Sequence, residues 1–322
     1  MNPFCKIILM SLPVLIVSCG RRQQEVEKTS VAVTRSLPSL TPPSMLQEQS
    51  EIAEWMALHY WDVLEGSSEG YLCDSAYVCG IAKAEMEQAM ANFIYILDML
   101  PIETALDASM KLAERMHACE EADTVSNVLE MLSSICERYM YDPNSPMRNE
   151  DYFQPVASML SQSPYMDEAS RGRFARISSK SKLNRIGTKA GDFRFCDRNG
   201  RSYSLYGIEA EYTLLFFSNP GCGSCLEIIN NIKSSEKVSR MISEGRLAVL
   251  NIYIDEDLQA WRDYMSIYPK EWYNGFDPEL VLRNNDIYYV RAIPSLYLLD
   301  ESKMVILKDA DPEKLFMTIQ NI

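Results

Sequence analysis

The sequence predicts two domains: an all-α domain in the N-terminal half and, after it, an α/β domain that begins with a β-hairpin. Three observations support this prediction. A length of 322 residues suits about two domains. From Ser44 to about residue 185 apolar residues recur at helical spacing, whereas from Ile186 onward they alternate with the period of a strand. A Cys-x-x-Cys pair, Cys222 and Cys225, follows a predicted buried strand and opens a helix-compatible segment.

The chain begins with features of a secreted lipoprotein. A short apolar run follows Lys6, which predicts a signal peptide over residues 1–18, because the run is too short to span a bilayer. Residues 16–19, Ile-Val-Ser-Cys, resemble a bacterial lipobox, and this resemblance implies acylation of Cys19. By analogy with lipoprotein sorting, Gly20 and the lack of an acidic run after it imply outer-membrane attachment facing the periplasm. The alternative is ordinary secretion with an incidental cysteine.

Residues 19–43 are predicted to be a flexible tether, since the stretch after the cysteine is polar and rich in Ser, Thr, Gln and Pro. Residues 44–185 are predicted to be the all-α domain. Ser44 suits a helix cap, and an apolar stripe from Ile52 to Val63 follows helical spacing. Further helices are expected at 82–100, 102–117, 123–141 and 151–160, and a sixth from about residue 164.

Residues 186–322 are predicted to be the α/β domain. Asn199-Gly200 is a strong signal for the type I′ turn of a hairpin at 190–205. The other expected elements follow in order: a strand from 212 up to the Asn-Pro-Gly break at 219–221, helix 226–232, strand 247–255, helix 257–267, strands 295–300 and 304–307, and a final helix from 311.

The chemistry of the Cys-x-x-Cys pair depends on its place at a helix start. A thiolate is the attacking species in disulfide exchange, and the free N–H groups at a helix N-terminus favour an anion. We therefore expect Cys222 to be the more exposed and more acidic thiol, and Cys225 to be the shielded thiol that resolves the mixed disulfide. A structural disulfide is the main alternative. A zinc site would need two more ligands, and the only histidines, His59 and His117, lie far upstream.

The remaining cysteines bear on the compartment. Nine cysteines, less Cys5 in the signal peptide and the acylated Cys19, leave seven, and this odd number implies at least one free or intermolecular thiol outside the cytosol. The five outside the Cys-x-x-Cys pair comprise two candidate pairs and one cysteine left over: Cys73 with Cys79, Cys119 with Cys136, and Cys196.

Four motifs in the C-terminal domain carry a family resemblance: Gly191-Asp192-Phe193, Phe-Phe-Ser-Asn-Pro-Gly-Cys-Gly-Ser-Cys at 216–225, Val-Leu-Asn-Ile-Tyr-Ile-Asp at 249–255 and Ala-Ile-Pro-Ser-Leu at 292–296. With them, residues 186–322 resemble the thioredoxin-like reductases of the TlpA and peroxiredoxin-like branch. The resemblance implies a thioredoxin-like fold and a cis peptide bond before Pro294. It also implies that the backbone of Ile293 pairs with an extended substrate chain, as exposed strand-like backbone can do without reading side chains.

The helical half has a resemblance of its own. Leu58-His59-Tyr60-Trp61 and the stretch 141–150, Tyr-Asp-Pro-Asn-Ser-Pro-Met-Arg-Asn-Glu, resemble a helical domain of unknown function. That domain precedes thioredoxin-like modules in Bacteroidetes lipoproteins. This second resemblance implies no particular chemistry.

The sequence departs from thioredoxin near the cysteines. The buried acid of thioredoxin would fall near Phe216, which cannot move a proton, and Gly221 stands where thioredoxin has an aromatic residue. Glu227 is the carboxylate nearest to Cys225 in sequence, which makes it the candidate proton acceptor through water; the alternative is a surface residue. The helix terminus is the only evident stabiliser of a thiolate, so we expect a modestly reducing or neutral redox couple.

Together these features predict an extracytoplasmic, membrane-anchored thiol-disulfide oxidoreductase that reduces or exchanges protein disulfides. The expected partners are protein disulfides, a redox partner that supplies electrons, and the membrane of the cell envelope through the N-terminal lipid. No cofactor or metal is expected, and the net charge of −14 argues against a nucleic-acid partner. The partner of the helical domain is not identified. The alternative is a non-catalytic binding or scaffold lipoprotein with a degenerate thioredoxin-like module.

Overall fold

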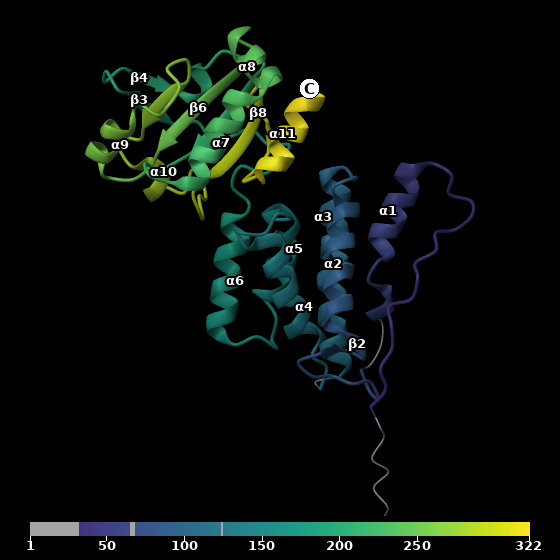
Figure 1. Cartoon of the computed structure of the whole chain (residues 1–322). Coiled ribbons are helices and arrows are strands. Elements are labelled where there is room, and N and C mark those ends of the chain that lie inside the picture. Colours follow the sequence, from purple (N-terminus) through teal and green to yellow (C-terminus); the bar gives the residue numbers. More distant parts are fainter. Residues whose placement is uncertain (1–31, 65–67, 124) are drawn as a thin grey trace, which may run out of the picture. The chain divides into compact units, whose positions relative to one another are not determined.

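The computed structural model describes residues 32–64, 68–123 and 125–322 (Figure 1). The predicted signal peptide, the predicted lipid-attachment residue Cys19 and the first part of the predicted tether lie outside the described residues. Among the helices that are described, none combines the length and the apolar character needed to cross a bilayer.

Helices make up the N-terminal domain, as predicted. They are α1 (Gln49–His59), α2 (Lys83–Leu97), α3 (Ile102–Ala122), α4 (Val128–Cys136), α5 (Glu150–Leu160) and α6 (Glu168–Lys180), with a 3-10 turn η1 (Asp62–Leu64) and a π-helical turn η2 (Glu137–Tyr141). Their apolar faces form one core, in which Phe93 and Phe153 are among the fully buried side chains. Burying a side chain of this size contributes roughly 1.5–3 kcal/mol to stability.

A small hairpin of β1 (Tyr77–Val78) and β2 (Ile81–Ala82) precedes α2 and was not predicted. Each strand has only two residues, too few for an alternating pattern to stand out. The chain reverses at Cys79 and Gly80, which have φ angles of 47° and 78°. Gly80 is typical of such a turn, but the residue before it, Cys79, also has a positive φ angle, which a cysteine rarely adopts. The sequence therefore gave only a weak indication of the turn.

Hydrogen bonds join the last part of the predicted tether to the helical domain. The N–H groups of Val33 and Arg35 donate to the carbonyl oxygens of Gly70 and Gly80, both at 2.8 Å. In this stretch the chain is therefore bonded to the domain, although the sequence led us to expect a free tether up to Pro43. A composition rich in Ser, Thr and Pro does not reveal main-chain hydrogen bonds to a distant segment.

The C-terminal domain is built on a seven-stranded sheet with the strand order β4-β3-β7-β6-β5-β8-β9. The strands are β3 (Arg194–Asp197), β4 (Ser202–Ser204), β5 (Tyr212–Phe217), β6 (Leu247–Tyr253), β7 (Tyr273–Phe276), β8 (Ser295–Asp300) and β9 (Val305–Leu307). The central strands β5, β6 and β7 are parallel to one another, and the outer pairs are antiparallel. The opening hairpin is thus β3–β4, as predicted, but its turn is not of type I′, because Gly200 has a positive φ angle and Asn199 does not.

Side chains of the central strand alternate between two apolar cores. Leu214 and Phe216 pack on the side covered by α7 (Gly223–Ser234), whereas Leu215 and Phe217 pack on the opposite side. Figure 1 shows α7 crossing the face of the sheet near β6 and β8. The other helices are α8 (Glu236–Ser243), α9 (Leu258–Tyr264), α10 (Val281–Asn284) and α11 (Pro312–Asn321), with a 3-10 turn η3 (Leu205–Gly207).

Three elements of this domain were not predicted from the sequence: β7, α8 and α10. The β7 sequence, Tyr-Asn-Gly-Phe, contains an Asn-Gly pair that normally favours a turn. Here Gly275 is required by packing, because a Cβ atom added to it would lie 2.5 Å from Cδ2 of Phe195 on the neighbouring strand. Close approach of two strands therefore overrides the local turn preference.

Candidate active site

The Cys-x-x-Cys motif lies where β5 ends and α7 begins. Gly221 turns the chain with a φ angle of 74°, and Cys222 is the N-cap residue of α7. The Sγ atom of Cys222 accepts a hydrogen bond from the backbone N–H of Cys225 at 3.1 Å. A sulfur atom in this position faces the free N–H groups of the first helical turn, which stabilise negative charge.

The two cysteines differ in exposure, in the direction the sequence predicts. Cys222 is half-buried, whereas Cys225 is 2% exposed and belongs to the apolar core under α7. Their sulfur atoms are joined in a disulfide, with the Cα atoms 5.2 Å apart. In this arrangement a partner molecule reaches Cys222 first, and Cys225 lies behind it with its sulfur bonded to that of Cys222.

The peptide bond between Ile293 and Pro294 is cis, as the resemblance implies. Pro294 directly precedes β8, and Ser295, the first residue of β8, pairs with Phe217, the last residue of β5. The Ile293–Pro294 loop and the Cys-x-x-Cys loop therefore leave the sheet at the same edge. The side chains of Ile293 and Cys222 also pack against the same apolar core, which places both loops around one site.

A buried polar network supports this site, and the sequence analysis missed it. Ser218 donates its hydroxyl to Oδ1 of Asn251, and Nδ2 of Asn251 donates to Oδ1 of Asn274 at 3.1 Å. All three are buried on adjacent strands or at their ends. Asn251 is opposite Phe216 in the sheet register, so the side chain beside the position of the thioredoxin acid is a neutral amide. The only sequence signal was one amide in an otherwise apolar strand.

A second contact holds the loop before the cysteines. Nδ2 of Asn219 donates to Oδ2 of Asp255 at 2.7 Å, which ties the Cys-x-x-Cys loop to the segment after β6. The hydroxyl of Tyr268 lies 3.4 Å from that of Ser218, and burial raises the pKa of Tyr268. These contacts hold the loop in place, and the one carboxylate among them, Asp255, is hydrogen-bonded to Asn219 of the loop.

Glu227 lies on the exposed side of α7, whereas Cys225 points into the core. The structure places this carboxylate among the surface residues of the helix, the alternative that the sequence left open. A role in accepting the proton of Cys225 stays a prediction.

The remaining described cysteines are unpaired: Cys73, Cys79, Cys119, Cys136 and Cys196. Neither of the candidate pairs, Cys73 with Cys79 or Cys119 with Cys136, forms a disulfide. Cys119 donates its S–H to the carbonyl of Leu64 at 2.8 Å, and burial raises its pKa to about 11. Burial also raises the pKa of Cys136, so both are protonated thiols of the helical core. Among residues 32–64, 68–123 and 125–322, His, Cys, Asp and Glu side chains form no cluster suited to a metal.

The strand order, the Cys-x-x-Cys pair at the start of α7 and the facing cis-proline together define a thioredoxin-like protein. The crystal structure of a thioredoxin-like protein from Bacteroides caccae is 34% identical to this chain; the match covers 90% of this chain and 99% of that one, with a TM-score of 0.74. Residues 18–184 match the family described as a domain of unknown function, DUF5106. The chain therefore belongs to the DUF5106 family.

Two further matches cover less than half of this chain. The C-terminal domain of an uncharacterised protein from Bacteroides fragilis is 45% identical, with 42% of this chain and 98% of that one covered and a TM-score of 0.42. The thioredoxin domain of a thiol-disulfide oxidoreductase from Bacteroides vulgatus is 17% identical, with coverage of 42% and 96% and a TM-score of 0.38. No curated protein matches the chain.

Proposed function

We propose that this protein is a thiol-disulfide oxidoreductase that reduces or exchanges disulfides of other proteins outside the cytoplasm. The observation that supports this most is the asymmetry of the pair. Cys222 is the accessible sulfur at the N-cap of α7, Cys225 is buried behind it, and the cis-proline loop lies at the same edge of the sheet. An inert structural disulfide has no need for this arrangement.

In the reductive direction, the thiolate of Cys222 attacks one sulfur of a substrate disulfide. The substrate S–S bond breaks, a mixed disulfide forms between Cys222 and the substrate, and the released substrate thiolate takes up a proton. The α7 N-terminus favours the thiolate form of Cys222 before the attack. The backbone of Ile293, before the cis-proline, pairs with the extended chain that carries the substrate disulfide.

Resolution uses the second cysteine. Cys225 loses its proton to solvent, and its sulfur attacks Sγ of Cys222. The mixed disulfide breaks, the substrate leaves with both sulfurs reduced, and the Cys222–Cys225 disulfide seen here remains. A thiol-bearing redox partner returns two electrons to this disulfide. The same steps in reverse oxidise a substrate dithiol, so the reduction potential of the pair sets the direction.

We also propose that the protein acts in the cell envelope, held by a lipid on Cys19 and facing the periplasm. This proposal rests on the lipobox-like sequence alone. Protein disulfides, an electron-donating redox protein and the membrane are its partners. The helical domain has no assigned partner.

Two serine variants test the redox function. Cys222→Ser is expected to lower the rate of insulin-disulfide reduction by roughly a hundredfold or more, because the attacking sulfur is gone. Cys225→Ser is expected to accumulate mixed disulfides with substrate proteins, seen as high-mass bands that a reducing agent dissolves, because resolution is blocked.

Cys196→Ser is the matched control, since Cys196 is unpaired and lies on β3 outside the motif. It is expected to behave as the unsubstituted protein does in both assays. If the unsubstituted protein reduces no disulfide and Cys225→Ser traps no protein, the redox proposal is wrong, and a binding or scaffold role takes its place.

A further inference from the structure

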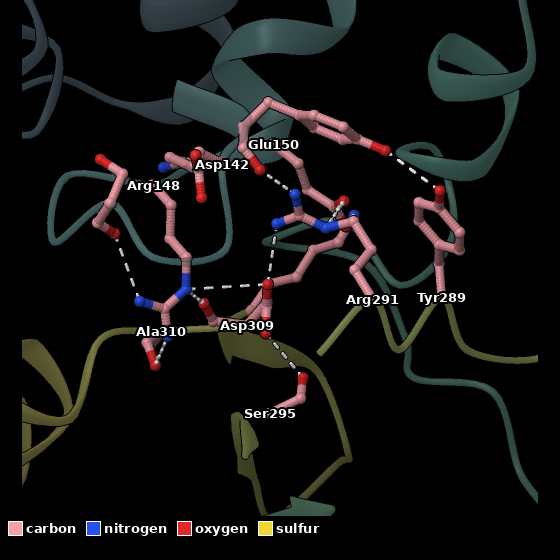
Figure 2. A network of polar contacts seen from close by, with 12 residues as sticks. Asp142, Arg148, Glu150, Tyr289, Arg291, Ser295, Asp309 and Ala310 are labelled. Atoms are coloured by element: carbon pink, nitrogen blue, oxygen red, sulfur yellow. Dashed lines mark hydrogen bonds and ion pairs between the residues drawn. The ribbon is translucent and has the colours of Figure 1, made fainter. Parts of the chain in front are cut away.

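Charged side chains of both domains form a buried cluster beside the cis-proline loop (Figure 2). We call it the interdomain cluster; its six members are Arg148, Glu150 and Asp151 of the helical domain and Arg291, Lys308 and Asp309 of the thioredoxin-like domain. None of these side chains is more than 8% exposed. Three are cationic and three are anionic, so the formal charges balance.

Each buried charge in the cluster has an opposite charge within reach. Nζ of Lys308 lies 2.8 Å from Oε1 of Glu150 and 3.1 Å from Oδ1 of Asp151. Nε of Arg291 lies 3.4 Å from Oε2 of Glu150. A buried charge that loses its partner strongly destabilises the folded protein. The ion pairs therefore favour one arrangement of these six side chains. The contacts cross between the domains, which means that the helical domain takes part in that arrangement.

Asp309 connects the cluster to both sides of the cis-proline. One carboxylate oxygen, Oδ1, accepts the hydroxyl hydrogen of Ser295, which follows Pro294, at 2.7 Å. The other, Oδ2, accepts from Nη2 of Arg291, three residues before Pro294, at 2.9 Å. The loop between these two residues contains the Ile293 backbone that the proposed function assigns to substrate binding. Its ends are therefore held by one side chain.

Arg148 of the helical domain fixes Asp309 in turn. Nε and Nη2 of Arg148 donate to the carbonyl oxygens of Asp309 and Ala310, each at 2.9 Å. Asp309 has a φ angle of 43°, a conformation that few non-glycine residues adopt without support. Two donors from one planar guanidinium specify both distance and direction. A contact from the DUF5106 domain thus sets the backbone that carries the bridging carboxylate.

The π-helical turn η2 provides a second, separate contact to the loop. Its last residue, Tyr141, stacks its ring on the guanidinium of Arg291, with 4.2 Å between Cζ and the ring centroid, and its carbonyl accepts from Nη1 of Arg291. The hydroxyl of Tyr141 lies 3.0 Å from that of Tyr289 (Figure 2). Single π-helical turns occur frequently at functional sites.

We propose that the DUF5106 domain positions the substrate-binding loop of its own thioredoxin-like domain, with Arg148 as a positioning residue that acts through Asp309. This inference rests on the proposed function, because it assigns a task to the Ile293–Pro294 backbone. The ligand of that backbone is an extended polypeptide with a disulfide. Cys222 takes part in none of the ion pairs that define the cluster, so we expect positioning to affect substrate binding and to leave the reactivity of the sulfur unchanged.

Arg148→Met tests the proposal in the full chain. Hydrogen exchange at the amides of Ser295 and Leu296 is expected to become about tenfold faster, since the loop loses its anchor. For reduction of insulin disulfides, KM is expected to rise by about fivefold or more with kcat nearly unchanged, the result for lost uniform binding. Alkylation of reduced Cys222 by iodoacetamide is expected to stay within about twofold of the unsubstituted rate.

Lys314→Met is the matched control. Lys314 on α11 reaches Asp98 at the end of α2 at 2.7 Å, so the variant also removes a contact between the domains, but one outside the cluster. It is expected to leave exchange at Ser295 and Leu296 unchanged. Equal exchange in folded Arg148→Met and Lys314→Met would overturn the proposal.

Two further outcomes have a defined meaning. If Arg148→Met does not fold, Arg148→Lys decides by the same criterion, because it keeps the charge and loses the paired donors. If the unsubstituted protein reduces no disulfide while Arg148→Met still speeds exchange at the loop, the proposed redox function is wrong and the positioning contact stands.

Discussion

The buried polar residues around the cysteines are mostly neutral, and this limits which groups can stabilise a thiolate at Cys222. Buried polar groups on the α7 side of the sheet include the amide of Asn251 and the hydroxyls of Ser218 and Tyr268, which do not ionise near neutral pH. Cys222 is the N-cap residue of α7, so we expect the positive end of the α7 dipole to be the main stabiliser of its thiolate.

Tyr297 and Tyr268 allow a residue-scale prediction on stability. Tyr297 on β8 is fully buried, and its hydroxyl has no hydrogen-bond partner within the described part of the chain, whereas the hydroxyl of Tyr268 contacts Ser218. Tyr297→Phe is expected to leave the free energy of unfolding at neutral pH unchanged or to raise it by up to about 1 kcal/mol. Tyr268→Phe is expected to lower it by about 0.5–1.5 kcal/mol. Urea unfolding measures both; a larger loss for Tyr297→Phe would contradict the prediction.

The buried hydroxyl of Tyr297 also predicts that stability depends on pH differently in Tyr297→Phe and in the unsubstituted protein at high pH. Burial raises the pKa of Tyr297 well above that of an exposed tyrosine, so the folded protein keeps a proton that the unfolded chain releases. Stability from this group is complete below about pH 10, the value in the unfolded chain, and is lost as the pH rises further. Tyr297→Phe should therefore show a shallower loss of stability above about pH 10 than the unsubstituted protein.

Residues with a local motif were predictable, and those without one were not. Cys222, Cys225 and Pro294 stand in short sequences whose geometry is recognisable. Arg148 and Asp309 lie 161 positions apart. Arg148 stands in the stretch 141–150 that carries the resemblance of the helical domain, but nothing in that stretch or around Asp309 indicates a contact between the two residues. Long-range ionic contacts depend on which surfaces meet, and this information is not present in periodicity or turn signals.

At the scale of elements, sequence periodicity predicted most of the helices and the strands β5 and β6, with errors at their ends. A strand was predicted from Tyr212 up to the Asn-Pro-Gly break at 219–221, and β5 spans Tyr212–Phe217, because an apolar run is diagnostic in a strand buried on both faces. α8 was missed although its apolar residues follow a helical period, since it directly follows α7 and its sequence is mostly polar. The strand β7 was missed because packing, not local preference, determines it.

Alanine substitutions at two glycines are expected to change the free energy of unfolding in opposite directions. Gly275→Ala is expected to lower the free energy of unfolding by about 1–3 kcal/mol, because the new methyl group would collide with Phe195 and separate β7 from β3. Gly172→Ala on α6 is expected to raise it by about 0.5–1 kcal/mol, since the site is open and alanine favours a helix. Thermal or urea unfolding measures both. Equal effects of the two changes would show that β7 does not pack as described.

At the scale of the whole molecule, residues 32–322 form one compact unit although they comprise two domains by sequence. The interdomain cluster contributes to this, because Glu150 and Asp151 find their counter-ion Lys308 only in the other domain. The sequence predicted the two fold classes but not the contact between them. Periodicity describes each domain separately, whereas the contact is a property of their surfaces together.

Attachment to the membrane is a prediction at this scale. Cys19→Ala in the full-length precursor, expressed in a bacterium with an outer membrane, is expected to move the protein from the membrane fraction to the soluble fraction. The physical reason is the loss of acyl chains, which bind a bilayer with about 0.8 kcal/mol per buried CH₂ group. Cys5→Ala is the control and should leave the protein with the membranes. Retention of Cys19→Ala in the membrane fraction would rule out the predicted anchor.

The buried ions also bear on how such proteins can change over evolutionary time. Glu150 and Asp151, with side chains no more than 1% exposed, face Lys308 from the other half of the chain. A gene fusion that supplied a different thioredoxin-like module, without cations at these positions, would leave two carboxylates without counter-ions in a buried interface. We therefore expect the two halves to be exchanged between proteins less readily than independent modules.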